Sequence, residues 1–284
     1  MSVSRKIALL QLCAGPDPSA NVDRTEAKIR EAAAAGAGIV CLQELFNARY
    51  FPQKVDVDRY ALAEPLPSPT TTRMQALAKE LEVVLIVPIF EEARPGVYFN
   101  SVVVYDADGA YLGKYRKTHI PDSPQYHEKF YFTPGDLGYP VFQTRFGVIA
   151  VGICWDEWFP EVARIFALAG AELLFYPSAI GSEPDRPGYS SAGAWKTVLC
   201  SHGITNGVFI AAVNRVGVED DMEFYGESFV SDPFGNVIAS AGSDEEVLLA
   251  DVDFSRNREL RELFHFLRDR RVDTYEPILR RLFE

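Results

Sequence analysis

The chain has 284 residues, of which 48% are hydrophobic, and a formal net charge of -12. This length can bury a substantial core, and we expect one domain over residues 1–284. The acidic charge argues against a nucleic-acid binder, which needs basic residues to replace the counterions around phosphates, and it favours a cationic or neutral small molecule.

The first segment, "MSVSRKIALLQLC", contains only a short apolar run. Such a run is too short for a signal peptide or a membrane span, so we interpret it as a strand and expect no membrane contact. The four cysteines show no CxxC spacing, which argues against a zinc knuckle or a disulfide framework. We therefore expect a cytoplasmic protein.

Apolar runs of strand length then alternate with helical patterns, which predicts a layered α/β fold. The first strand precedes a helix in "NVDRTEAKIREAAAAG", with Asn21 as its cap and Gly36 at its end, and then the strand "AGIVCLQE". A second unit follows, with a helix in "SPTTTRMQALAKELE" and the strand "VVLIVPIFEE".

Three hairpins are predicted next, which makes the sheet mixed. One spans residues 98–117 with a turn at Asp108 and Gly109, and the others lie in "VFQTRFGVIAVGI" and "SFVSDPFGNVIAS". Helices are predicted over 160–169 and 192–206, followed by a late strand in "EEVLLADVDF". Residues 255–284 form the C-terminal helix and tail, for which we expect a place at a subunit contact.

The segment "VGICWDEWFPE" places Cys154 where an apolar strand ends, shortly before a helix that starts near Pro160. α/β folds place reactive groups at such junctions, and a helix N-terminus favours a thiolate. One interpretation of this position is a nucleophile with a lowered thiol pKa. From this segment alone, a buried structural cysteine is an equal alternative.

Three other charged residues are candidates for the same chemistry. Glu44 ends a strand, where it is either a solvated charge or a general base for Cys154. Lys117 closes a hairpin arm, and beside Cys154 it would lower the thiol pKa and stabilise an oxyanion together with the Trp155 backbone N–H. Glu128, in an aromatic-rich loop, is by default a solvated acid.

The segments "LQEL" with Glu44, "YRKTHIP" with Lys117 and "GICWDEWFPE" with Cys154 resemble, in this order, the three catalytic motifs of the nitrilase superfamily. The resemblance implies a four-layer α-β-β-α sandwich that pairs into a larger sandwich in a homodimer or larger homo-oligomer. It also implies Glu44 as general base, Lys117 as oxyanion stabiliser and Cys154 as nucleophile, with Glu128 positioning the lysine and the substrate. No cofactor or metal is implied, and the four histidines show no metal-binding spacing.

Within the superfamily, "SAIGSEP" and "FLRDRRVDTY" resemble the branch that hydrolyses N-carbamoylputrescine to putrescine, carbon dioxide and ammonia. A pocket for this cationic substrate needs a carboxylate and aromatic faces, for which we select Glu183 and Tyr50.

Two alternatives stay open. A substrate with a carboxylate, such as N-carbamoyl-β-alanine, another N-carbamoyl amino acid or an ω-amide, would need a pocket arginine, and Arg186 and Arg215 are near enough in sequence to serve. A non-catalytic binding protein of the same fold is the other alternative, although all three catalytic residue types are present.

Overall fold

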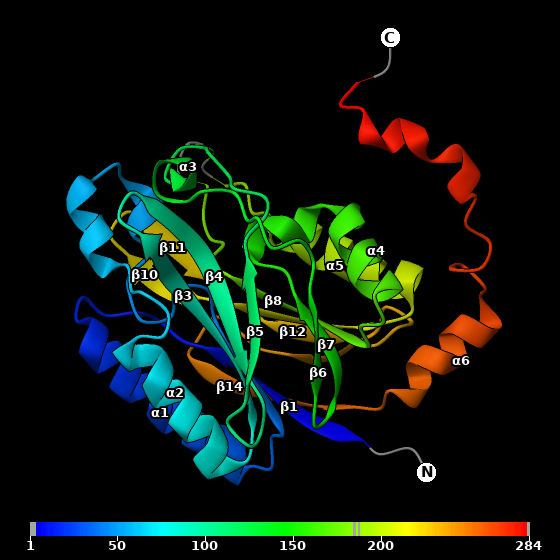
Figure 1. Cartoon of the computed structure of the whole chain (residues 1–284), viewed down its shortest axis with the longest axis horizontal. Helices are drawn as coiled ribbons and strands as arrows, with labels where there is room; N and C mark the ends of the chain where they lie inside the picture. Colours follow the sequence, from blue (N-terminus) through cyan, green and yellow to red (C-terminus); the bar gives the residue numbers. More distant parts are fainter. Residues whose placement is uncertain (1–3, 184–185, 187, 283–284) are drawn as a thin grey trace.

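The structure is a computed structural model that describes residues 4–183, 186 and 188–282. Two mixed six-stranded sheets lie face to face in this part of the chain, with α1 and α2 on one side and α4 and α5 on the other (Figure 1). The first sheet has the order β14-β1-β2-β3-β4-β5 and the second β13-β12-β9-β8-β7-β6. The predicted four-layer sandwich is confirmed.

The elements of the first half bear out the predicted strand and helix order. The first sheet consists of β1 (Arg5–Gln11), β2 (Ile39–Leu42), β3 (Val84–Arg94), β4 (Val97–Tyr105), β5 (Tyr111–Arg116) and β14 (Glu246–Val252). Its outer face is covered by α1 (Pro18–Ala34) and α2 (Pro69–Leu81), and the short helices η1 (Phe51–Gln53), η2 (Val57–Leu62) and α3 (Glu128–Tyr131) lie in the connections.

The second half repeats this plan. The second sheet consists of β6 (Val141–Thr144), β7 (Gly147–Val151), β8 (Leu173–Ser178), β9 (Phe209–Asn214), β12 (Phe229–Ser231) and β13 (Val237–Ser240). The helices are η3 (Cys154–Trp158), α4 (Pro160–Leu168), α5 (Ala192–Asn206), α6 (Ser255–Leu263), η4 (Val272–Thr274) and η5 (Glu276–Leu279). A separate hairpin pairs β10 (Val216–Glu219) with β11 (Met222–Tyr225).

The alternation of side chains along each strand creates two cores. Ile7 and Leu9 of β1 pack between the sheets, in one cluster with Phe175 of β8. Ala8 and Leu10 point the other way, into a cluster with α1 and α2. Because both faces of β1 are buried, its sequence is a continuous apolar run rather than an alternating one.

The predicted cap of the first helix is wrong. The helix begins at Pro18, and the Asp17 side chain accepts a hydrogen bond from the Ser19 N–H at 2.9 Å. Asn21 lies inside the helix and is buried, where its amide donates to the Gly15 and Asn47 carbonyls at 2.9 and 3.2 Å. An aspartate followed by proline is the stronger start signal, because proline suits the first helical turn.

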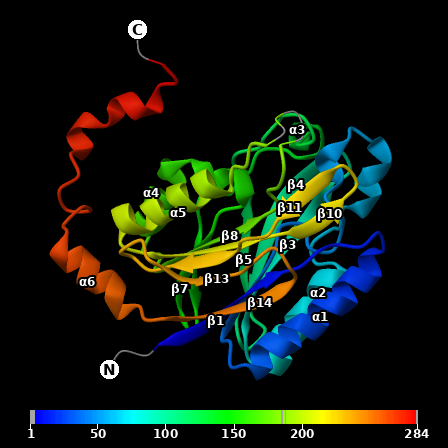
Figure 2. The same cartoon turned by 180° about the vertical axis from the view of Figure 1, so that it is seen from behind.

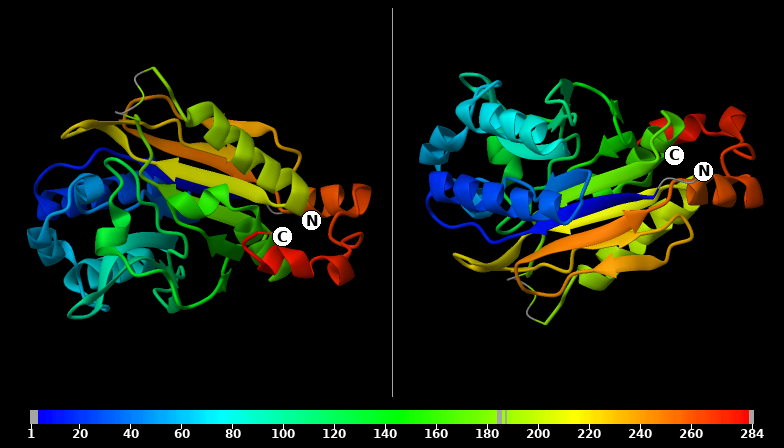
Figure 3. Two further views of the ribbon diagram at one scale, coloured as in Figure 1. Left: turned by 90° about the horizontal axis from the view of Figure 1, so that it is seen from above. Right: turned by 90° about the horizontal axis from the view of Figure 1, so that it is seen from below.

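The C-terminal segment leaves the body of the molecule. Viewed from behind, α6 and the segment after it curve away from the sheets (Figure 2). Views from above and below place them at one end of the molecule (Figure 3). α6 ends at Leu263, earlier than the charged pattern of "RNRELRELFHFLRDRR" indicates.

Candidate active site

Glu44, Lys117 and Cys154 come together from strand ends of both sheets. Glu44 follows β2 and Lys117 follows β5 in the first sheet, whereas Cys154 follows β7 in the second. The carboxyl ends of parallel strands such as β2 and β7 are where open α/β sheets hold their ligands. The exposed fractions of the three residues are 0%, 0% and 6%.

Lys117 lies between two buried carboxylates. Its Nζ is 2.8 Å from Glu44 Oε1 and 2.6 Å from Glu128 Oε2. The Asn100 amide also donates to Glu44 Oε1, at 2.6 Å. Glu44 Oε2 is buried and has no hydrogen-bond partner among the described residues, so this oxygen can accept a proton.

The backbone around Lys117 is fixed on both sides. Its N–H donates to the Asn100 carbonyl and its carbonyl accepts from the Gly135 N–H, both at 2.8 Å. A Cβ on residue 135 would lie 2.1 Å from the Arg116 carbonyl oxygen, so only glycine fits there. The ammonium group is therefore held in one place before any substrate binds.

Burial and charge act against each other in this cluster. Burial lowers the pKa of Lys117, but Glu128 and Glu44 outweigh it and hold that pKa well above its usual value. Burial raises the pKa of Glu128 to about 7, although Lys117 opposes the change. The lysine stays charged, whereas Glu128 titrates near neutral pH.

Cys154 adopts an unusual backbone conformation, with φ of 43°. Non-glycine residues seldom occupy this left-handed region, and such strain is concentrated at functional sites. The Asp156 carboxylate braces the turn, since Oδ2 accepts from the Ile153 N–H at 3.0 Å and from the Tyr115 hydroxyl at 2.8 Å. Its Oδ1 accepts from the His119 N–H at 2.9 Å, which ties the Cys154 turn to the segment after Lys117.

The predicted lowering of the thiol pKa is wrong. Burial raises the pKa of Cys154 well above its usual value, and the charge of Glu44 raises it further, while Lys117 opposes both effects. The nearby lysine is visible in the sequence, whereas the desolvation of the thiol depends on the fold. The thiol is therefore protonated at rest and needs a base at the moment of attack.

A cavity of about 170 Å³ opens over Cys154. Its described lining contains two carboxylates and three aromatic rings but no lysine or arginine, and comprises Pro121, Ser123, Tyr126, Glu128, Cys154, Trp155, Trp158, Ile180, Glu183 and Ser191. Trp155 and Glu183, which the sequence analysis selects, both line this cavity.

Tyr50 occupies a different position from the one expected of a substrate contact. It is fully buried, does not belong to the described cavity lining, and donates its hydroxyl hydrogen to Glu128 Oε1 at 2.7 Å. Tyr50 is the residue directly before η1. Tyr126 and Trp158 are the aromatic lining residues that sequence reasoning missed.

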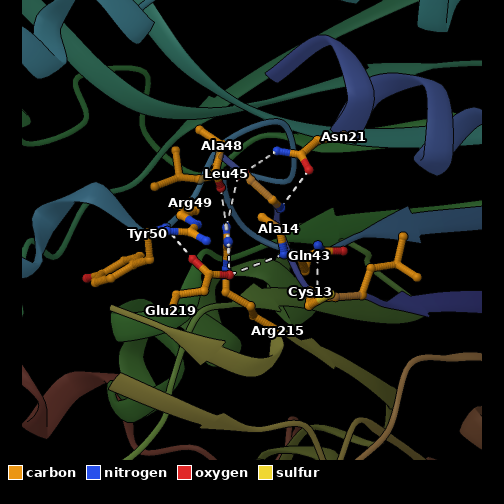
Figure 4. A network of polar contacts seen from close by, with 12 residues as sticks. Cys13, Ala14, Asn21, Gln43, Leu45, Ala48, Arg49, Tyr50, Arg215 and Glu219 are labelled. Atoms are coloured by element: carbon orange, nitrogen blue, oxygen red, sulfur yellow. Dashed lines mark hydrogen bonds and ion pairs between the residues drawn. The ribbon is translucent and has the colours of Figure 1, made fainter. Parts of the chain in front are cut away.

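The two candidate arginines for a substrate carboxylate lie elsewhere. Arg215 is fully buried, and its guanidinium binds Glu219 and the backbone carbonyls of Glu44, Leu45 and Ala48 (Figure 4). Arg186 is exposed and is not in the described lining. Neither arginine faces the cavity.

The residues that the structure describes lack two further features. They contain no group of three or more His, Cys, Asp and Glu side chains that is suited to hold a metal ion. They also contain no helix that is both long and apolar enough to span a membrane.

Comparison with known proteins identifies the family. The carbon-nitrogen hydrolase family matches residues 6–262, so the chain belongs to this family, and the resemblance to the nitrilase superfamily is confirmed. The chain is similar to N-carbamoylputrescine amidase of Solanum lycopersicum, with 47% identity covering 96% of this chain and 94% of the relative. It is also similar to citrullinase of Francisella tularensis, with 40% identity covering 97% and 98%.

A solved structure agrees with the fold. The crystal structure of a carbon-nitrogen hydrolase from Helicobacter pylori superimposes with a TM-score of 0.95 at 39% identity, covering 99% of this chain and 100% of that one. The protein is therefore an amide-hydrolysing enzyme with the nitrilase fold.

Proposed function

We propose that the protein hydrolyses N-carbamoylputrescine to putrescine, carbon dioxide and ammonia. The observation that carries the proposal is the composition of the cavity over Cys154, whose described wall holds Glu128, Glu183 and aromatic rings but no basic residue. Carboxylates and aromatic faces attract an alkylammonium group. The similarity to plant N-carbamoylputrescine amidases supports the same substrate.

The reaction starts with transfer of the Cys154 proton to Glu44, whose Oε2 has no other described partner. The sulfur attacks the carbamoyl carbon, and the carbonyl oxygen becomes an oxyanion. Lys117 uses two of its three N–H donors on Glu44 and Glu128, so one is left for the oxyanion beside the Trp155 N–H.

The tetrahedral intermediate collapses when the C–N bond breaks and Glu44 protonates the leaving amine. Glu44 then takes a proton from water, which attacks the thioester-like intermediate and frees Cys154. The resulting carbamic acid loses carbon dioxide. Both orders of departure, ammonia first or diamine first, give the same products.

The competing substrates carry a carboxylate. Such a group would face Glu128 and Glu183 in a cavity whose described lining lacks an arginine. Arg215 is already engaged by a carboxylate and three backbone carbonyls. We therefore propose a preference for the cationic compound over N-carbamoyl-β-alanine and over citrulline, the substrate suggested by the similarity to citrullinase.

The test is ammonia release from these three compounds by the wild-type protein, with Cys154→Ala as the blank. We expect turnover of N-carbamoylputrescine at the highest kcat/KM and none by Cys154→Ala. Glu183→Gln should raise KM for N-carbamoylputrescine and leave KM for a neutral amide unchanged. Preference for a carboxylate-bearing compound would contradict the substrate, and activity of Cys154→Ala would contradict the nucleophile.

Three wider features are proposed with the function. The chain works as one domain over 1–284, supported by a family match across most of its length. Free thiols at Cys13, Cys41, Cys154 and Cys200 suit a reducing compartment such as the cytoplasm. Exposed apolar side chains after α6, among them Leu279 with an exposed fraction of 84%, support a homo-oligomer with residues 255–284 at the contact.

A further inference from the structure

We infer that the buried ion pair between Arg215 and Glu219 is a positioning device that sets both carboxylates flanking Lys117. The inference rests on the proposed function, because it assigns roles relative to Glu44 and Glu128. One end of the pair binds the carbonyls of Glu44 and Leu45, and the other binds the Tyr50 N–H. Figure 4 shows the pair with Leu45 and Tyr50 beside it. The Tyr50 hydroxyl in turn binds Glu128.

The arginine end fixes the chain directly after the proposed base. Arg215 Nη2 donates to the Glu44 carbonyl at 2.8 Å and to the Leu45 carbonyl at 2.9 Å, and Nη1 donates to the Ala48 carbonyl at 3.0 Å. Leu45 has φ of 51°, so the turn after Glu44 is strained and needs this support. A planar guanidinium can hold several carbonyls at fixed angles, which an ammonium cannot.

The glutamate end reaches the other carboxylate through one residue. Glu219 Oε1 is 2.7 Å from Arg215 Nη1, and Oε2 accepts from the Tyr50 N–H at 2.6 Å. The Tyr50 hydroxyl in turn donates to Glu128 Oε1 at 2.7 Å. A shift of Glu219 therefore displaces the Tyr50 backbone and, with it, the hydroxyl that orients Glu128.

Burial of the two charges of the Arg215–Glu219 pair costs desolvation free energy, which suggests that the pair has a role other than stability. Arg215 and Glu219 have exposed fractions of 0% and 1%. A buried ion pair often contributes little net stability compared with apolar side chains of similar volume. Its contacts lead toward Glu44 and Glu128, so positioning of these carboxylates explains the pair better than stability does.

The first test is Glu219→Gln, because Arg215 and the Tyr50 N–H bind different oxygens of the carboxylate, and in the amide one of these acceptors is replaced by an NH2 group that only donates. We expect kcat to fall on the order of a hundredfold with little change in KM, as for a misplacement of about 1 Å. Tyr50→Phe should lower kcat through the same path, so the double variant should be no slower than the worse single variant. Additive effects of the two changes, or an unchanged kcat in Glu219→Gln, would overturn the inference.

The control is Asp232→Asn, which weakens another ion pair with a buried carboxylate, 3.0 Å from Arg256. Asp232 lies in the turn after β12, outside the active site. This change should lower thermal stability and leave kcat unchanged. If Asp232→Asn lost as much kcat as Glu219→Gln, the loss would reflect lower stability and the inference would be overturned. If Glu219→Gln does not fold, Glu219→Asp keeps the charge, shortens the side chain and serves the same comparison.

A second readout separates this inference from the proposed function. The rate of Cys154 alkylation by iodoacetamide, corrected with Cys154→Ala, depends on how Glu44 is placed and requires no turnover. Slower alkylation in Glu219→Gln than in Asp232→Asn supports positioning even if none of the three substrates reacts, in which case the proposed function alone fails. If the wild type does turn over a substrate but Cys154 is alkylated at the same rate in Glu219→Gln and in Asp232→Asn, the proposed function is retained and the inference is overturned.

Discussion

Glu157 is a buried acid near the nucleophile that the proposed mechanism does not use. It lies in η3 with an exposed fraction of 0%, and its Oε2 accepts from the Ser178 hydroxyl at 3.0 Å. Burial raises its pKa to about 8. The folded protein therefore holds this side chain protonated at neutral pH, where the unfolded chain would have it ionised.

This difference predicts a pH-dependent effect of Glu157→Gln on stability. Between the unfolded pKa of 4.5 and the folded pKa of about 8, folding takes up a proton, so wild-type stability falls as pH rises, by up to about 1.4 kcal/mol per pH unit. A glutamine at position 157 does not titrate, so it adds no such pH dependence to the unfolding free energy. The gain in unfolding free energy of Glu157→Gln over wild type should grow from pH 5 to pH 8 and then level off.

Chemical denaturation at several pH values measures this gain. Glu161→Gln makes the same chemical change at an exposed position and is the matched control. A gain that is equal at pH 5 and pH 8 would contradict the protonated state of Glu157.

For single residues, the sequence predicts the candidate catalytic side chains better than it predicts the residues that hold them in place. Strand ends and motif order single out Glu44, Lys117 and Cys154, whereas Glu128 is singled out only by the family resemblance. Asn100 was missed, although a polar residue inside the apolar run "YFNSVVVY" is a visible signal. The contacts of Arg215 could not be predicted, because they join residues about 170 positions apart and depend on tertiary structure.

Among the smaller elements, the β10–β11 hairpin connects the backbone at Glu44, through Arg215, to the cavity wall. It carries Glu219 of the ion pair at one end of β10, and Glu223 in β11 accepts at its carbonyl from the Ser182 N–H at 2.7 Å. Ser182 precedes Glu183 of the cavity lining. A small hairpin outside both large sheets therefore joins two parts of the active site.

Gly181→Ala should disturb this connection. A Cβ at residue 181 would lie 2.4 Å from the Glu223 carbonyl oxygen, so the hairpin or the cavity loop must move. We expect a loss of about 1–3 kcal/mol in stability and a higher KM. Gly193→Ala, which has open space around the new methyl group, is the control in the same assays, and an unchanged KM in Gly181→Ala would contradict the coupling.

Element types were predicted more reliably than their ends. The hairpin with Asp108 and Gly109 and the helix over 192–206 match the structure, because turn residues and a terminal glycine are local signals. The start of α1 was misplaced because Asn21 resembles a cap in sequence but bridges two loops in the fold. The end of α6 at Leu263 could not be predicted, because the local sequence pattern does not show where packing against the two sheets ends.

Considered as a whole, the molecule exposes several large apolar side chains in the described segment after α6. Val272, Ile278 and Leu279 have exposed fractions of 65%, 62% and 84%. Removal of residues 264–284 should lower the oligomeric state in sedimentation without unfolding the sandwich, because both sheets are complete before residue 253. Val57→Ser, at another exposed apolar residue, is the control, and a wild-type monomer would contradict the proposed contact.

The pairing of β14 with β1 determines when the first sheet can be finished. β14 forms the edge beside β1, with Arg5 opposite Val252, although more than 200 residues separate the two strands. At typical rates of synthesis, the nascent chain waits roughly 10–50 s between them. Throughout that interval β1 offers unpaired backbone groups to any other strand. A chain broken off before Glu246 would contain Glu44, Lys117 and Cys154, and yet it would be prone to aggregate through its first strand.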